Sequence, residues 1–461
     1  MAEAGNPGDI AARLERLPPS RAVWRIIGLI SLGGCFEYYD LFMTAYVSPG
    51  LIAAGVFHAG RNGLFGLSDQ AAFAAATFAG LFVGTLVFSQ VADRFGRRAV
   101  FTGSLLWYTA ATLAMAGQSS ATGVDLWRLI AGIGIGVELV TIDAYVVEFA
   151  PAAMRGRALA INQAIQFLAV PAVAFACWLL VPRQILGLAG WRWVMILGAA
   201  GAAVVWIIRA RLPESPRWLA AHGRQAQADA ILRTLEARVE AETGPLPAPR
   251  PQPAVAAGQG RFAELFRRPY LGRVVLLSVF NVAQTIGFYG FGNWLPSLIA
   301  AQGHSITRSL AWSFVIAIAY PLSPLLFSGL ADRVERKWQI VAAAVCTATL
   351  GLAFARRSAP AALIALGVGI TLSNNLLSYA FHTYQAELFP TRIRARAVGF
   401  VYSWSRLSTV FTSFMVAFFL QAAGTRGVFA FIAAAMGVVV VTIGVFGPRT
   451  GGRALETISD V

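Results

Sequence analysis

The sequence predicts an all-α membrane protein in which twelve transmembrane helices form two parallel six-helix repeats. Of the 461 residues, 57% are hydrophobic and 13% are charged, about half the charged fraction of an average soluble domain. The apolar residues gather into segments of about 20 residues, the length that crosses roughly 30 Å of hydrocarbon. Sequence motifs also return at one fixed spacing in the second half of the chain. The bilayer is therefore the expected solvent of this chain.

Twelve apolar segments of this length fall into two groups of six. The first group covers 23–51, 70–91, 98–117, 124–149, 157–181 and 191–209, and the second covers 273–299, 310–331, 338–355, 360–388, 395–420 and 426–447. The chain then divides into an N-terminal segment at 1–22, a first bundle at 23–209, a central loop at 210–272, a second bundle at 273–447 and a tail at 448–461. Within the loop, QAQADAILRTLEARVEAE is helix-like, and the Pro-rich stretch after it reads as an extended linker.

Two motifs repeat between the halves. FSQVADRFGRR at 88–98 returns as FSGLADRVERK at 327–337, and YVVEFAPAAMRGRA at 145–158 returns as YQAELFPTRIRARA at 384–397. Asp93 to Asp332 and Glu148 to Glu387 are both 239 residues, so the halves are copies with the same membrane orientation. Parallel six-span repeats that bind a substrate between them are a transporter design.

Basic residues indicate the orientation of the chain. Arginine and lysine gather in one set of loops, at 94–98, 155–157, 333–337 and 392–396, and are sparse in the alternate set. Because cytoplasmic loops carry the positive charge, we expect both termini and the central loop in the cytoplasm and the spans in the inner membrane. The net charge of +15 is spread over these short clusters, which argues against a nucleic-acid partner.

The cysteine pattern excludes other classes of site. Cys35, Cys177 and Cys346 lie in apolar sequence without paired spacing, which argues against a disulfide framework and a metal site. No GxxxxGK[ST] loop is present, so an ATP-driven pump is unsupported. We expect no cofactor and no metal, and a monomer whose partners are the lipid bilayer, protons and a small molecule.

Charged side chains inside the spans are the main functional signal, because they are costly there and usually serve a purpose. CFEYYDLF at 35–42 carries Glu37 and Asp40 on one helix face. At 1.5 Å per residue, Glu37, Asp40, Glu138 and Arg406 lie about 18, 22, 16 and 15 Å deep. A low-dielectric cavity favours the neutral form of a carboxylic acid, whereas arginine stays charged and can bind an anion as a fork. We expect Asp40 to carry a proton, with Glu37 and Glu138 assisting; a structural ion-pair network is the alternative.

These motifs resemble those of the major facilitator superfamily, and within it the sugar and metabolite porter branch. ADRFGRR is similar to the signature between spans 2 and 3, although Ser89 and Ser328 stand where that signature has glycine. RLIAGIGIGVE at 128–138, PESPRWL at 213–219 and PRTGGRALETI at 448–458 resemble three further motifs of the branch. The acid-x-x-acid pattern of span 1 is similar to that of metabolite and aromatic-acid proton symporters. The resemblance implies the major facilitator fold and alternating access.

The resemblance also implies a gate of charged side chains at the cytoplasmic helix ends, which latches neighbouring helices in one state. The candidates are Asp93, Arg97, Arg98, Glu148, Arg155 and Arg157 in the first half and Asp332, Arg336, Glu387 and Arg394 in the second. For each arginine, positive-inside topology alone is an alternative explanation. The glycines of GIGIG at 132–136 are read as helix-packing positions.

Polar groups on other spans are candidate substrate ligands. They are Gln163, Gln166, Asn281, Gln284, Tyr289, Asn293, Asn374 and Asn375. Gln163 resembles a span-5 glutamine of sugar porters, whereas span 7 lacks their paired-glutamine pattern. Arg128 matches the fourth-span arginine of the family but stands close to the outer edge beside Asp125, where it either snorkels or pairs, or else contacts substrate.

Together these features favour proton-coupled symport of a small organic anion, a carboxylate or an aromatic acid, rather than an enzyme. A sugar or polyol porter is the first alternative, supported by PESPRWL and Gln163. A proton-coupled efflux antiporter is the second. A membrane sensor on an inactive transporter scaffold is the third, which the retained midplane acids disfavour.

Overall fold

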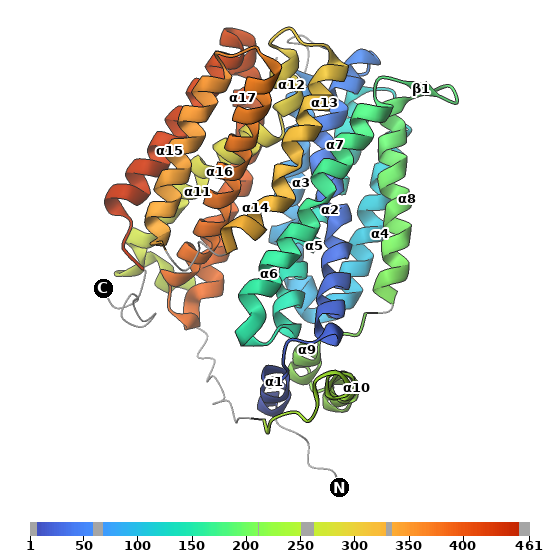
Figure 1. The fold of residues 1–461 in the computed structure, drawn as a ribbon, viewed down its shortest axis with the longest axis vertical. Coiled ribbons are helices and arrows are strands. Elements are labelled where there is room, and N and C mark those ends of the chain that lie inside the picture. The colour runs from blue at the N-terminus through green and yellow to red at the C-terminus, as the bar shows by residue number, and fades with distance from the viewer. Residues whose placement is uncertain (1–6, 59–67, 211, 250–261, 329–333, 451–461) are drawn as a thin grey trace.

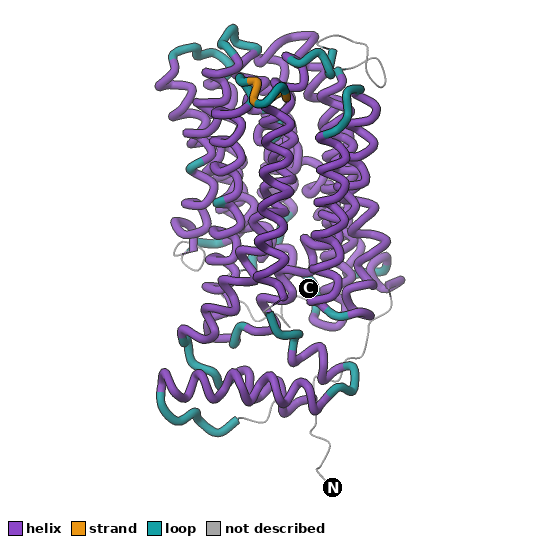
Figure 2. The backbone as a smooth tube through the Cα atoms, turned by 90° about the vertical axis from the view of Figure 1, so that its right-hand side faces the viewer, coloured by secondary structure: helices purple, strands orange, loops and turns teal. Residues whose placement is uncertain are grey.

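The computed structural model describes residues 7–58, 68–210, 212–249, 262–328 and 334–450. At some positions inside helices, among them Asp93, Arg97 and Glu138, only the backbone is described. The chain forms two helical bundles that stand side by side, with a smaller helical layer at one end (Figure 1). We call this the α10 end, after the helix Gln225–Thr243 that runs across it (Figure 2).

The first bundle holds the six spans expected in the first half of the chain. They are α2 (Arg21–Ala53), α3 (Asp69–Phe95), α4 (Arg97–Ala116), α5 (Ala121–Phe149), the pair α6 (Ala152–Phe167) and α7 (Ala169–Leu180), and α8 (Gly190–Ala210). A short antiparallel hairpin of β1 (Gln184–Ile185) and β2 (Leu188–Ala189) connects α7 to α8, with Gln184 opposite Ala189. The hairpin lies at the end of the bundle away from α10 (Figure 1).

The second bundle is built in the same way. It holds the pairs α11 (Tyr270–Gly292) with α12 (Leu295–Ala300) and α13 (Ile306–Ala317) with α14 (Ala319–Ser328), followed by α15 (Arg336–Phe354), α16 (Pro360–Glu387) and α17 (Thr391–Val441), which ends in η3 (Thr442–Phe446). The 51-residue α17 is interrupted at Gly424, whose φ of 62° and ψ of −158° are not helical. Only glycine adopts this conformation readily, so Gly424 divides α17 into the last two spans.

The count of twelve spans is confirmed, once one long run is divided and α8 is added. Ten helical runs in the described residues are long and apolar enough to cross a membrane. One of them, Arg396–Phe446, is the run that Gly424 divides, and α8 supplies the remaining span with 21 residues.

Three of the expected spans are broken helices, which the sequence analysis did not anticipate. Proline lacks an N–H and its ring clashes with the carbonyl four residues earlier, so it breaks a helix just before itself. The breaks stand at Leu168, at Asn293–Trp294 and at Ile318, two or three residues before Pro171, Pro296 and Pro321. Prolines in the sequence therefore account for all three.

Glycines bring α3 and α5 into close contact, as expected for GIGIG. A Cβ atom at Gly132 would lie 2.6 Å from the Thr77 carbonyl oxygen, and one at Gly136 would overlap the Leu81 carbonyl. Gly80 and Gly84 of α3 face the same contact, against Leu129 and Ile133. Small residues permit this approach in a bilayer, where van der Waals packing and hydrogen bonds hold helices together.

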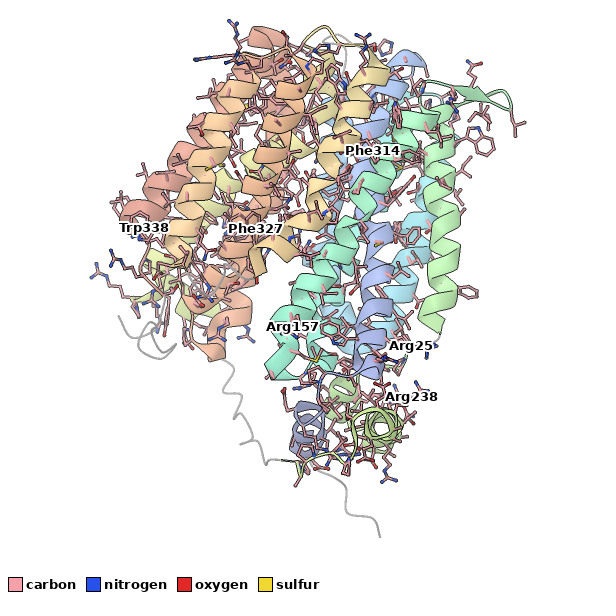
Figure 3. All side chains as sticks on the ribbon, viewed as in Figure 1. Arg25, Arg157, Arg238, Phe314, Phe327 and Trp338 are labelled. Atoms are coloured by element: carbon pink, nitrogen blue, oxygen red, sulfur yellow. The ribbon has the colours of Figure 1, made fainter. Side chains whose placement is uncertain are left out.

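The N-terminal segment and the central loop form a layer at the α10 end. α1 (Pro7–Glu15) places Ile10 and Leu14 in an apolar core with Leu232 and Leu235 of α10 and with α9 (Pro216–Ala221). Arg13 and Arg16 pair with Glu236 at 2.5 and 2.6 Å, and Arg13 also pairs with Asp229. Arg25 of α2, Arg157 of α6 and Arg238 of α10 mark this end (Figure 3).

The halves converge at the end opposite α10 and diverge toward it (Figure 1). Phe42 and Tyr320 meet edge to face at 5.3 Å between ring centroids, and Trp178 stacks on Phe314 at 6.1 Å. Gln70 donates a hydrogen bond to Ser297 at 2.8 Å. These contacts join the first bundle to the second away from the α10 end.

Candidate functional site

Asp40 and Arg128 form a buried ion pair inside the first bundle. Arg128 is 0% exposed and Asp40 is 4% exposed. Arg128 Nη1 donates to Asp40 Oδ2 at 2.8 Å, and Nη2 donates to the Asp40 carbonyl oxygen at 2.7 Å. Arg128 Nε donates to Thr77 at 2.9 Å, and Thr112 donates to Asp40 Oδ1 at 3.0 Å. The pair therefore ties α2, α3, α4 and α5 together.

This pair decides between the alternatives left open for Arg128. Arg128 does not snorkel to the membrane edge, because it is fully buried and its guanidinium donors face Asp40 and Thr77. Asp40 faces a counter-charge, as in the ion-pair network that was the alternative expectation, and the partner is Arg128. Glu37, one turn earlier on α2, is also completely buried. A cavity of about 10 Å³ lies beside Asp40, lined among others by Tyr39, Tyr108 and Thr112, close to the ~10–15 Å³ that one water needs.

Arg406 of α17 is the second buried cation, 7% exposed. Its Nη1 donates to the Tyr289 hydroxyl at 3.0 Å and its Nη2 to the Tyr402 hydroxyl at 3.4 Å. The Tyr402 ring centroid lies 5.1 Å from the Arg406 guanidinium carbon. Among the described residues, no carboxylate lies within ion-pair distance of Arg406. Phenol oxygens and an aromatic face thus surround a permanent positive charge.

The tyrosines around Arg406 connect the two bundles. The Tyr289 ring lies 4.6 Å from Phe78 of α3. Tyr38 of α2 accepts a hydrogen bond from Gln163 of α6 at 3.3 Å and is within electrostatic range of Arg406. We call Tyr38, Gln163, Tyr289, Tyr402 and Arg406 the central cluster. It lies between the halves, where the two repeats of a transporter bind substrate.

Two titratable residues near the central cluster were missed by the sequence analysis. Asp143 of α5 accepts a hydrogen bond from Asn162 at 2.9 Å and is within electrostatic range of Tyr38 and Tyr402. Its side chain is exposed, although it stands about 9 Å inside the helix end at Phe149. The sequence could have pointed to Asp143, because it is an acid within the expected span 124–149.

His382 of α16 is the other missed residue. Its Nδ1 lies 2.7 Å from the Ser378 carbonyl oxygen, and its ring lies 5.3 Å from Tyr402. Like Asp143 it is exposed, yet it is within electrostatic range of Arg406. Both missed side chains are therefore exposed at the level of the central cluster.

Several of the other candidate ligands have described contacts outside the central cluster. Asn281 donates to the Leu277 carbonyl and to Gln385, within the second bundle. Asn293 lies at the break between α11 and α12, and Gln166 packs against Gly34. Gln284 and Asn375 are buried. Among the described residues, no group of three His, Cys, Asp or Glu side chains could hold a metal ion.

The gate candidates that the structure describes lie at the α10 end. Arg336 pairs with Glu387 at 3.0 Å between α15 and α16, and Arg394 Nε donates to the Phe389 carbonyl at 3.1 Å. Arg155 pairs with Glu15 of α1 at 2.9 Å. Arg157 is exposed, and the backbone N–H of Arg98 donates to Glu214. Asp332 and the side chains of Asp93, Arg97 and Glu138 lie outside the described residues.

Comparisons with known proteins agree with this architecture. A family model described as sugar (and other) transporter matches residues 27–461. The chain is 32% identical to the putative metabolite transport protein YyaJ of Bacillus subtilis, over 97% of both chains. It is 24% identical to the niacin transporter NiaP of Acinetobacter baylyi, over 98% of this chain and 99% of that one.

A solved structure of the xylose transporter XylE from E. coli shares the fold. It superposes with a TM-score of 0.76 at 19% identity, covering 94% of this chain and 100% of XylE. The family model thus covers nearly the whole sequence. Its match includes both bundles, with the charged pair buried in the first bundle and the polar cluster between the halves. The chain belongs to the sugar (and other) transporter family of the major facilitator superfamily.

Proposed function

We propose that this transporter imports a small organic anion, an aromatic or related carboxylate, together with protons. The observation that carries the proposal is Arg406, a buried guanidinium held by two tyrosine hydroxyls without a carboxylate partner among the described residues. A buried charge needs compensation, and a carboxylate can replace the weak phenol contacts with a bidentate, charge-assisted pair.

The surroundings of Arg406 favour a flat apolar body on the anion. Tyr402 presents its ring to the guanidinium, and Tyr38 meets Phe167 edge to face at 5.3 Å. Aromatic walls of this kind prefer offset or edge contacts with a ring ligand. The niacin transporter among the relatives acts on an aromatic carboxylate, which supports the same substrate class here.

Proton coupling is assigned to the Asp40–Arg128 pair. Protonation of Asp40 would weaken its ion pair with Arg128 and release a cation that binds α2, α3 and α5 in one arrangement. Glu37 and Glu138 remain secondary candidates for the proton, and Asp143 joins them because its side chain is exposed.

We assign the α10 end to the cytoplasm of a bacterial inner membrane, with both termini on that side, because Arg25, Arg157 and Arg238 all lie at this end (Figure 3). The contacts between the halves lie toward the opposite end, which corresponds to an inward-facing state of a monomer.

A sugar or polyol is the second candidate substrate. Gln163 hydrogen-bonds the Tyr38 hydroxyl within the central cluster, and a neutral polyol needs such amide and hydroxyl partners. The distinguishing feature is Arg406, whose permanent charge a neutral ligand would leave uncompensated.

Transport by reconstituted protein tests the proposal. Proteoliposomes with an acidic exterior are offered labelled nicotinate, benzoate or xylose, and uptake is followed with and without a protonophore. We expect carboxylate accumulation that the protonophore abolishes and that Arg406→Lys weakens. Accumulation of xylose without competition by either carboxylate would reject the anion assignment in favour of the sugar alternative.

A further inference from the structure

A groove on the outer surface of the first bundle is separate from the central cluster. It runs between α4 and α5, has a volume of about 400 Å³, and is lined by Gly103 and Trp107 of α4, by Ile133, Gly134 and Val137 of α5, and by Phe95 at the end of α3. Phe95 and Trp107 are 60% and 50% exposed, so the groove is open along the bundle surface. Its walls are almost entirely apolar.

The shape of the groove is built into the helices that border it. A Cβ atom at Gly103 would meet nothing within 4 Å, so the missing side chain leaves a hollow. Trp107 donates its indole N–H to the Ile130 carbonyl at 2.8 Å and is held against α5. The Trp107 ring also lies against Gly134, where a Cβ atom would stand 2.7 Å from it. The Trp107 ring, held in place by these contacts, therefore closes one end of the groove.

The length and depth of the groove match one leaflet of a bilayer. α4 begins at Arg97 at the α10 end, and Trp107 stands ten residues later, about 15 Å along the helix. Half of the roughly 30 Å hydrocarbon core has this thickness. The groove thus extends from the membrane surface at the α10 end to the bilayer centre.

Two described arginines stand at the open end of the groove. Arg94 and Arg98 are both exposed and flank Phe95 and Ala99, where the groove begins. Glu214 accepts a hydrogen bond from the backbone N–H of Arg98. Basic side chains at the head-group level recognise anionic lipids.

We propose that this groove binds an anionic glycerophospholipid, with one acyl chain between α4 and α5 and the phosphate beside Arg94 and Arg98. A polar substrate would not be stabilised by these apolar walls, whereas the groove faces the acyl chains of the surrounding bilayer. Lipid tails gain no hydrophobic free energy by leaving the bilayer. Close packing along the groove and the arginine–phosphate attraction therefore provide the selectivity.

The test measures lipid retained by the full-length protein. Delipidated protein in detergent is supplied with palmitoyl-oleoyl phosphatidylglycerol or with the matching phosphatidylcholine, and bound lipids are counted by native mass spectrometry. Wild type should keep one phosphatidylglycerol more tightly than any phosphatidylcholine. Gly103→Phe should lose that lipid, because the new ring occupies the hollow. The matched control is Gly437→Phe, at an exposed position of α17 where a Cβ atom also meets nothing within 4 Å.

A second pair of variants separates the head group from the acyl chain. Arg94→Gln with Arg98→Gln should remove the preference for phosphatidylglycerol over phosphatidylcholine while leaving the groove intact. Gly103→Leu replaces Gly103→Phe if the latter lowers the melting temperature relative to Gly437→Phe. Equal phosphatidylglycerol retention by wild type and the groove-filling variant overturns the proposal, as does an absence of head-group preference in wild type.

Discussion

Arg128 Nη1 lies 2.8 Å from Asp40 Oδ2, in an ion pair between residues 88 positions apart that is almost wholly removed from solvent. Two threonines complete it, Thr77 as acceptor from Arg128 and Thr112 as donor to Asp40. Breaking a buried pair by removing one partner leaves an uncompensated charge and costs about 3–5 kcal/mol. Protonation of Asp40 would also remove one charge of the pair, so the packing of the helices that Arg128 joins can respond to a proton.

Asp40→Asn should abolish accumulation driven by a pH gradient and preserve energy-independent exchange of substrate, because exchange need not release the proton. The measurement is uptake and counterflow in proteoliposomes, with the melting temperature recorded for each protein. Thr112→Val is the control, since it removes one hydrogen bond from Asp40 and keeps the ion pair. Continued proton-driven accumulation would show that another acid, Glu138, Glu37 or Asp143, carries the proton. Loss of both activities together would make the pair purely structural.

Arg406→Lys should reduce carboxylate affinity by about 10- to 100-fold, because it replaces a bidentate fork by a point charge. Hydrogen bonds to charged groups contribute about 1.5–3 kcal/mol, which corresponds to that range. Isothermal titration with nicotinate or benzoate measures the change. Tyr289→Phe keeps the guanidinium and removes one hydroxyl contact, so its effect should be smaller. Unchanged affinity in Arg406→Lys would remove Arg406 from the substrate site.

Docking of α1 on the first bundle should weaken in acid. Burial by itself would raise the pKa of Glu15, but hydrogen bonds from the Ala152 N–H and Arg217, with the charge of Arg155, outweigh it and the pKa is lowered from 4.5. The pKa of Asp229 is lowered by the Arg13 hydrogen bond, despite some burial. A lowered pKa means that the stabilisation is complete above the ordinary value and is lost as pH falls below it.

Hydrogen exchange of residues 7–15 measures this docking. Protection should be constant from pH 7 to about 5 and should fall below about 4.5. Glu15→Gln should lower protection already at pH 7, because it loses the ion pairs with Arg155 and Arg217. The matched control is Asp9→Asn on the exposed face of α1, which should leave protection unchanged. Equal protection in all three proteins would show that apolar packing alone holds α1.

Single cysteines should report opposite sides of the membrane at the two ends of the bundle. In a background without Cys35, Cys177 and Cys346, Arg224→Cys beside α10 should react only with a reagent that reaches the cytoplasm. Leu186→Cys, at the 85% exposed hairpin turn, should react with an impermeant reagent added outside. Labelling of both from the same side would contradict the twelve-span topology.

Most of the fold could be predicted from local sequence. Span length follows from bilayer thickness, and the repeat offset follows from two motif pairs, so both were available without a structure. The helix breaks at Leu168 and Ile318 were also available, because Pro171 and Pro321 stand in the sequence. Asp143 was available in the same way, as an acid within an expected span. The helix of the central loop was recognised and is α10.

What the sequence determined, then, is depth: it places Asp40, Arg128 and Arg406 along their helices. Only the tertiary structure decided direction, whether a side chain points to a neighbouring helix, to the space between the halves or to lipid. Lipid and the packed interior are both apolar, so hydrophobic periodicity carries little information about which face of a span looks inward. The role of Arg128 stayed open for this reason, because a charge close to the end of α5 can snorkel outward or reach Asp40 across the bundle. The pairing of Glu15 with Arg155, 140 residues apart, likewise exists only once α1, α6 and α9 are packed together.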